Sequence, residues 1–215
     1  MIVSPSIASS DILHVAKEVD FAVKTCNQIH LDVEDGVAVQ GISFGMKMCK
    51  KIKEISENAY ISLHLEVFDP LCYLEELKEL KPDIIFVQTD HLKNRECVLK
   101  AFKASGLNCG VSLSDRDLEK DNEKIIELSD QVMVLTASLS DPKQQFQIKM
   151  ADYAQRIAYD FAKKVWIDGG ISCDIYEELS YNCPDVYAAV MGRGFFGDKD
   201  AFKAIYKGRE KCTMY

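Results

Sequence analysis

The sequence predicts an α/β protein in which residues 1–215 form a single (β/α)8 barrel. Short apolar runs rich in β-branched residues alternate with longer amphipathic stretches along the whole chain, and each kind occurs eight times. Eight such units in a chain of this length favour closure of a parallel sheet into a barrel. The alternative is an open doubly wound sheet, which would normally carry a glycine-rich turn after its first strand. Here that turn reads PSIASSD.

The expected strands are mostly β-branched or aromatic, and several are continuously apolar, as is typical of strands buried on both faces. We place them at Met1–Ile7, Gln28–Val33, Tyr60–Val67, Ile84–Thr89, Cys109–Leu113, Gln131–Thr136, Lys164–Asp168 and Val186–Met191.

The expected helices have apolar residues three and four positions apart, and Asp or Ser precedes several of them as a candidate N-cap. They cover residues 11–26, 46–57, 71–80, 94–105, 123–129, 146–163, 173–181 and 200–211. The one irregular connection is Ala137–Gln145, a loop rich in turn-forming residues.

The composition of the chain indicates which kinds of partner and which cellular compartment to expect. The formal net charge is -8, and the acidic and basic residues are interspersed, so we expect neither a nucleic-acid nor a membrane partner. The amino terminus does not resemble a signal peptide, and no apolar run is long enough to span a membrane. The eight cysteines form no CxxC pair, which favours reduced thiols in a cytoplasmic protein. Apolar residues on the outer helices are compatible with a homo-oligomer.

Polar side chains gather at the expected carboxyl ends of three strands, where a barrel of this kind places its active site. His30 and Asp32 are two apart and therefore share one face of a strand, His64 lies in the next strand, and Asp168 ends the seventh. A lone histidine in a strand is often only a hydrogen-bonded core residue. Two imidazoles with two carboxylates, however, suit Zn²⁺, Mn²⁺, Fe²⁺ or Co²⁺, and the sequence therefore predicts a metal site. His14 and His91 fall outside this set, on a helix and in a loop.

Two glycine-containing turns follow the last two strands. Gly169 and Gly170 come after the seventh strand, and Gly192 and Arg193 come after the eighth. Barrels commonly bind a phosphate group there through backbone N–H groups, so these turns predict a phosphorylated substrate.

The segments SPSIASSD, IHLDVEDG followed by ISFG, SLHLEV, WIDGGIS and VMGRGFFG resemble the ribulose-phosphate 3-epimerases in order and spacing, from Ser4 to about Gly197. The resemblance implies metal-dependent epimerisation of a ketose phosphate at the carbon next to the ketone, by proton transfer between two bases. It assigns one divalent metal to His30, Asp32, His64 and Asp168, and makes Asp32 and Asp168 the acid/base pair. It assigns substrate contacts to Ser6, His64, Gln144, Gly169, Gly170, Gly192 and Arg193.

The residue types suit this chemistry independently of the resemblance. Epimerisation removes a proton from one face of a carbon and returns a proton to the other face, which requires two opposed proton-transfer groups. It also requires an electrophile for the negative charge on the ketone oxygen, which a metal ion supplies, and no organic cofactor is needed.

The chain departs from the family pattern on the substrate side. Glu34, Glu66 and Leu135 stand where the family usually has methionines that form an apolar lid, and Gln88 stands where a histidine is expected. We interpret the glutamates either as acceptors for substrate hydroxyls or as solvated rim residues. These changes predict a substrate preference that has moved away from ribulose 5-phosphate.

The loop after the sixth strand also differs. The family's NPGFGGQ is replaced by residues 138–144, of which only Gln144 is retained, and Arg193 replaces a serine. We expect Lys143 or Arg193 to replace the lost phosphate contacts. Two other functions stay open: a phosphate-binding barrel lyase or decarboxylase, although the DxKxxD segment of those enzymes is missing after Asp32, and a non-catalytic relative.

Overall fold

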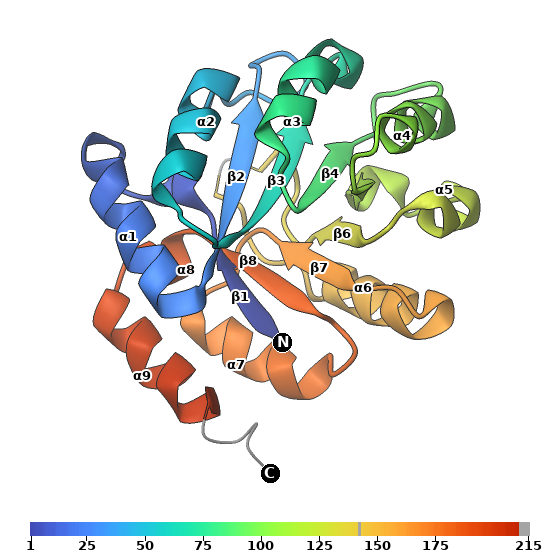
Figure 1. Ribbon diagram of the computed structural model, residues 1–215. Helices are drawn as coiled ribbons and strands as arrows, with labels where there is room; N and C mark the ends of the chain where they lie inside the picture. The colour runs from blue at the N-terminus through green and yellow to red at the C-terminus, as the bar shows by residue number, and fades with distance from the viewer. Residues whose placement is uncertain (142, 211–215) are drawn as a thin grey trace.

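The computed structural model describes residues 1–141 and 143–210, and in it eight parallel strands form a nearly closed barrel surrounded by helices (Figure 1). This confirms the predicted (β/α)8 fold. The strands are β1 Ile2–Pro5, β2 Gln28–Glu34, β3 Tyr60–Glu66, β4 Ile84–Gln88, β5 Cys109–Leu113, β6 Val132–Leu135, β7 Val165–Asp168 and β8 Ala188–Met191.

The helices follow the strands in alternation and pack their apolar faces on the outside of the barrel (Figure 1). They are α1 Val15–Cys26, α2 Met46–Ile55, α3 Leu74–Leu80, α4 Arg95–Ala104, α5 Glu123–Leu128, α6 Ile148–Phe161, α7 Cys173–Asn182, α8 Arg193–Phe196 and α9 Lys199–Glu210. The short helix α8 was not expected from the sequence. Lys211, the last residue of the expected final helix, lies outside the described residues.

The element boundaries differ from expectation where the chain makes short 3-10 turns. The first strand ends at Pro5 because Ile7–Ser9 already forms such a turn. The helices expected at 11–26 and 71–80 also begin as 3-10 turns, since the carboxylates of Asp11 and Asp69 accept hydrogen bonds from the amides of Leu13 and Leu71.

The strand order is β1-β8-β7-β6-β5-β4-β3-β2, and a bridge between Ser6 and His30 brings β1 alongside β2 to complete the ring. In the β2–β3 register Asp32 lies opposite His64, and Glu34 lies opposite Glu66. Because alternate residues of a strand point to the same face, this register places all four side chains inside the barrel at its carboxyl end.

The lower part of the barrel interior is a plug of apolar and aromatic side chains. Trp166 packs there against Phe86, Tyr60 and Tyr187, with ring centroids 5.4, 6.2 and 5.8 Å away. A larger apolar core lies between the strands and the surrounding helices. This plug closes the barrel interior below the polar side chains of the carboxyl end and so forms the floor of the site.

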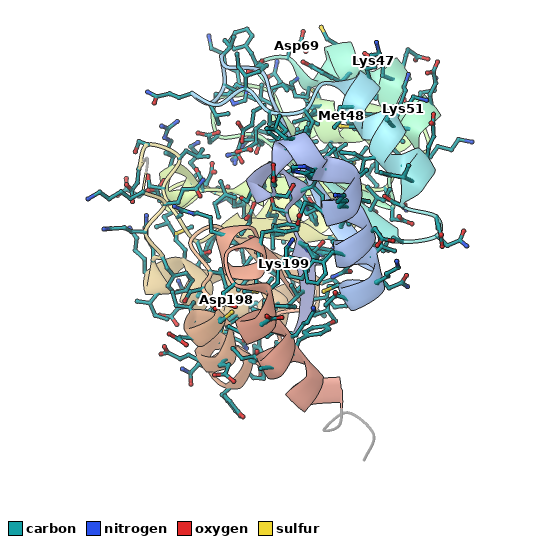
Figure 2. The ribbon with its side chains drawn as sticks, turned by 90° about the vertical axis from the view of Figure 1, so that its left-hand side faces the viewer. Lys47, Met48, Lys51, Asp69, Asp198 and Lys199 are labelled. Atoms are coloured by element: carbon teal, nitrogen blue, oxygen red, sulfur yellow. The ribbon has the colours of Figure 1, made fainter. Side chains whose placement is uncertain are left out.

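The last helix closes the outer layer next to the first. Lys199, at the start of α9, lies beside α1, and its Nζ donates a hydrogen bond of 2.7 Å to Glu18 (Figure 2). Every cysteine in the described part of the chain is a free thiol. Among residues 1–141 and 143–210, no helix combines the length and apolar character needed to cross a membrane.

Candidate active site

The four side chains predicted to meet do converge at the carboxyl end of the barrel. His30 and Asp32 come from β2, His64 comes from β3, and Asp168 ends β7, and one ligand atom from each lies within 4.8 Å of the others. His64 Nδ1 is nearly equidistant from the two aspartates, 3.9 Å from Asp32 Oδ1 and 3.8 Å from Asp168 Oδ2.

The two imidazoles each leave one buried nitrogen without a hydrogen bond. His30 Nε2 and His64 Nδ1 are buried and have no hydrogen-bond partner, although His30 Nε2 lies 3.1 Å from Asp32 Oδ1. The other nitrogens are bonded, with His30 Nδ1 2.7 Å from Ser62 Oγ and His64 Nε2 3.1 Å from Gln88 Oε1. Unsatisfied buried imidazole nitrogens facing two carboxylates fit the requirements of a divalent transition metal, because neutral imidazole and carboxylate oxygens are its usual ligands.

The environments of the two aspartates push their pKa values in opposite directions. Burial alone would raise the pKa of Asp32, but the neighbouring His30 and His64 and a hydrogen bond from Ser6 outweigh it and hold the pKa well below its usual range. Burial and the charge of Asp32 raise the pKa of Asp168. A pair of carboxyl groups with separated pKa values can act as one base and one acid. Burial lowers the pKa of His64 to about 4, which favours its neutral, metal-binding form.

A cavity of about 1040 Å³ opens above this cluster. Its wall contains almost all the residues expected to contact substrate, namely Ser6, Gln144, Gly169, Gly170, Gly192 and Arg193, together with Asp32, Asp168, Glu34, Glu66 and Leu135. His64 lies below this wall, within the cluster. Ser6 has a further contact that the sequence did not indicate, since its hydroxyl donates a hydrogen bond of 2.6 Å to Asp32 Oδ2.

Gly170 allows the β6 loop and the β7 turn to approach each other closely. Its φ is +73°, and a Cβ atom there would lie 2.6 Å from the carbonyl oxygen of Gln144. A side chain at this position would force the two segments apart and change the cavity wall.

The ribulose-phosphate 3-epimerase family model matches residues 2–196. The chain belongs to this family. The ribulose-phosphate 3-epimerase of Helicobacter pylori (strain J99 / ATCC 700824) is 27% identical over 212 residues, which cover 95% of each chain. That of Bacillus subtilis (strain 168) is 24% identical and covers 94% of this chain and 95% of its own. These relatives agree with the resemblance found in the sequence.

Solved structures with the same architecture are more distant. The tryptophan synthase α-subunit of Pyrococcus furiosus superposes with a TM-score of 0.69 at 14% identity, covering 96% of this chain and 94% of its own. KGPDC from Streptococcus mutans gives a TM-score of 0.66 at 11% identity, covering 100% of this chain and 99% of its own. At these identities the likeness shows the shared barrel fold alone.

Two glutamates, Glu34 and Glu66, also line the cavity. Glu66 is only 7% exposed, and its Oε2 lies 3.6 Å from His64 Nδ1. The interpretation of Glu66 as a solvated rim residue is therefore wrong, because β3 carries it into the barrel. Glu34 is half-buried and lies against Gly41 in the loop that follows β2. Burial, followed by the charge of Asp32, raises the pKa of both glutamates.

The loop after β6 is held by its own side chains and by Arg193. The carboxylate of Asp141 accepts hydrogen bonds of 2.9 and 2.8 Å from the amides of Lys143 and Gln145, so these donors already have a partner. Arg193 Nη2 donates to the carbonyl oxygen of Lys143 at 3.0 Å and to Gln144 Oε1 at 3.3 Å. Arg193 thus links the β8 turn to this loop across the cavity. Pro142 lies outside the described residues.

Ser62, Gln88 and Asp90 surround the cluster and were not included among the site residues predicted from sequence. Ser62 precedes His64 by two positions and Gln88 ends β4, so both face the barrel interior. The alternation of inward positions could have indicated them, although their hydrogen-bond partners could not be read from the sequence. His14 and His91 lie away from the cluster, as expected. His14 bonds to Asp11, and His91 stacks on Phe68.

Proposed function

We propose that the chain epimerises a ketose phosphate at the carbon next to the ketone, with D-ribulose 5-phosphate converted to D-xylulose 5-phosphate, or a related ketose phosphate, as the reaction. The observation that carries the proposal is the pair of aspartates, Asp32 buried and Asp168 half-buried, whose pKa values are separated and which lie around the His30–His64 pair. Membership of the family supports the same reaction class.

Proton transfer is assigned to Asp32 and Asp168. One carboxylate takes the proton from the carbon next to the ketone, and the other, in its acid form, delivers a proton to the opposite face. The sugar exchanges one hydrogen for another, keeps its composition and inverts at one carbon, and the two aspartates exchange protonation states. The reverse reaction uses the same groups with their roles exchanged. Ser6 holds Asp32 in a fixed orientation for this transfer.

His30, Asp32, His64 and Asp168 would hold one divalent ion, Zn²⁺, Mn²⁺, Fe²⁺ or Co²⁺. When bound, it supplies positive charge next to the ketone oxygen, where negative charge develops during proton removal. His30 and His64 contribute lone pairs from nitrogens that the protein leaves unsatisfied. The Trp166 plug below the cluster excludes water from that side.

The phosphate group is assigned to the part of the cavity wall formed by the turns after β7 and β8. Gly169, Gly170 and Gly192 line the cavity there, and Arg193 is a cationic side chain of those turns that also lines it. Gln144 and His64 complete the proposed substrate contacts. A guanidinium group can bind phosphate with two hydrogen bonds, which compensates for the backbone donors that Asp141 occupies.

The test is solvent exchange at the carbon next to the ketone. The full chain is incubated with D-ribulose 5-phosphate in D₂O, and proton NMR follows both deuterium incorporation and formation of the epimer. Asp32→Asn and Asp168→Asn should each abolish epimerisation, since general acid–base groups contribute about 10²–10⁴-fold, while one variant retains exchange from its own face. Asp185→Asn, on the α7–β8 loop, is the matched control. Near-complete epimerase activity in either site variant would contradict the two-base assignment.

A further inference from the structure

Gln88 connects the buried His64 to a carboxylate outside the cluster. It ends β4, its side chain is completely buried, and it lies between His64 and Asp90. Its Nε2 donates a hydrogen bond of 2.9 Å to Asp90 Oδ1, and its Oε1 lies 3.1 Å from His64 Nε2. The three side chains therefore form a continuous hydrogen-bonded chain.

Asp90 forms an ion pair with Arg116 and acts as a hydrogen-bond acceptor. Its side chain is only 4% exposed, and its Oδ2 accepts a hydrogen bond of 3.0 Å from Arg116 Nη1. Lys120 Nζ donates to the main-chain carbonyl of Asp90 at 3.0 Å. An ionised carboxylate has no proton to donate, so the amide group of Gln88 must present its NH₂ to Asp90.

The orientation of the Gln88 amide determines which nitrogen of His64 carries the proton. With its NH₂ directed to Asp90, Gln88 presents a carbonyl oxygen to His64 Nε2, and a carbonyl oxygen only accepts. His64 Nε2 must therefore carry the hydrogen. Its Nδ1, the buried nitrogen without a hydrogen bond, is then left with a lone pair aimed at the aspartates.

We propose that Gln88 and Asp90 are positioning residues that fix His64 in the Nε2–H tautomer, so that its Nδ1 is presented to the metal. His30 is oriented in the opposite sense, because its Nδ1 bonds to Ser62 and its Nε2 faces the cluster. The consequence for metal affinity rests on the metal site of the proposed function, whereas the tautomer of His64 does not. Partners of this kind typically change metal affinity by about 10–100-fold.

The first test removes the acceptor. Gln88→Leu has nearly the same volume and leaves His64 Nε2–H without a partner, so the affinity of the full chain for Zn²⁺ should fall about 10–100-fold in a competition titration against a chelating dye. Gln131→Leu is the matched control, since Gln131 is hydrogen-bonded to Trp166 and Tyr60 at the opposite end of the barrel. This control also replaces a hydrogen-bonded glutamine by leucine and should leave the affinity unchanged. An unchanged affinity in Gln88→Leu would overturn the proposal.

The second test exchanges the donor and acceptor roles along the hydrogen-bonded chain formed by Asp90, Gln88 and His64. In Asp90→Asn, Arg116 attracts the amide oxygen, so the Asn NH₂ faces Gln88, which must turn and present its own NH₂ to His64. The proton of His64 then moves to Nδ1, and Zn²⁺ binding weakens. The double variant Gln88→Glu with Asp90→Asn restores an acceptor opposite His64 Nε2 and should recover most of the affinity. The double variant is nearly isosteric with the wild-type chain. If it folds but does not recover the affinity for Zn²⁺, the proposed roles of Gln88 and Asp90 are wrong.

Nitrogen-15 NMR of the His64 ring in the chelator-treated full chain reads the tautomer directly. The wild-type chain and the double variant should show Nε2–H, and Asp90→Asn should show Nδ1–H. A wild-type His64 in the Nδ1–H form would refute the proposal. If the wild-type chain binds no Zn²⁺, the metal site of the proposed function is wrong, while the NMR result still decides the role of Gln88 and Asp90.

Discussion

The hydroxyl of Ser6 donates a hydrogen bond of 2.6 Å to Asp32 Oδ2. Ser6 lies just beyond β1, at the bridge that joins β1 to β2, so the closure of the barrel brings this hydroxyl to the aspartate. Asp32, one of the two proposed proton-transfer groups, is thus oriented by a residue that follows β1, the strand next to β2 in the closed barrel.

Ser6→Ala should therefore lower kcat more than it raises KM. A hydrogen bond to a charged group contributes about 1.5–3 kcal/mol, which corresponds to about a tenfold to hundredfold loss of rate. Steady-state kinetics with ribulose 5-phosphate measure the effect. Ser10→Ala is the matched control, because Ser10 lies in the same segment and its hydroxyl donates to the carbonyl oxygen of Ile7. Equal kinetics in Ser6→Ala and the control would exclude an orienting role.

Metal removal should reduce both activity and thermal stability. A ligand present at about 1,000 times its Kd stabilises the folded state by about 4 kcal/mol, so chelation should lower Tm and added Zn²⁺ should restore it. His64→Ala should lose most of this metal-dependent shift as well as its metal content, measured by atomic absorption and calorimetry. His14→Ala should retain both, since His14 is exposed and bonds to Asp11. A metal-independent Tm in the wild-type chain would argue against the site.

The convergence of His30, Asp32, His64 and Asp168 could be predicted from the sequence because side chains alternate regularly between the two faces of a strand. His30 and Asp32 alternate with apolar residues in β2, so both had to face inward, and the parallel order placed His64 beside Asp32. The hydrogen bonds of Ser6 and Gln88 were not predictable in this way. They join side chains from different strands, and their lengths depend on the stagger of the closed barrel, which no local pattern encodes.

The loop after β6 was the least predictable part of the site. Its composition indicated a turn, but its conformation depends on Asp141 accepting from two amides of its own loop and on Arg193 reaching across from the β8 turn. The sequence also left open whether Glu66 is buried or solvated, because a charged residue near the end of a strand can be either. The structure buries it, with its side chain in the wall of the cavity.

Arg193→Ala should raise KM for the phosphorylated substrate with a smaller effect on kcat. The change removes the guanidinium that contacts the carbonyl oxygen of Lys143 and the side chain of Gln144, and with it the proposed phosphate contact. Inhibition by inorganic phosphate gives a second measurement and should weaken in parallel. Arg156→Ala removes an arginine from the outer helix α6 and serves as the control. An unchanged KM and unchanged inhibition would exclude Arg193 from phosphate binding.

The last prediction concerns substrate preference and follows from the carboxylates of Glu34 and Glu66. They lie side by side as register partners of β2 and β3 and line the cavity next to the cluster of His30, Asp32, His64 and Asp168. No hydrogen bond of the Glu66 carboxylate is found within the described part of the chain, so a substrate hydroxyl could donate to it. A site built to bind a hydroxyl rejects an analogue without it by about 10⁴–10⁵-fold.

We therefore expect another ketose phosphate, with a hydroxyl that reaches these carboxylates, to exceed ribulose 5-phosphate in kcat/KM. Ketose phosphates of four to six carbons are compared for the wild-type chain and for Glu34→Met and Glu66→Met, which should shift the preference back towards ribulose 5-phosphate. Leu135→Met is the matched control, because it introduces the third methionine of the family's lid without removing a carboxylate. If the wild-type chain turns over ribulose 5-phosphate faster than every other sugar, and Glu66→Met leaves that ranking unchanged, the carboxylates do not select the substrate.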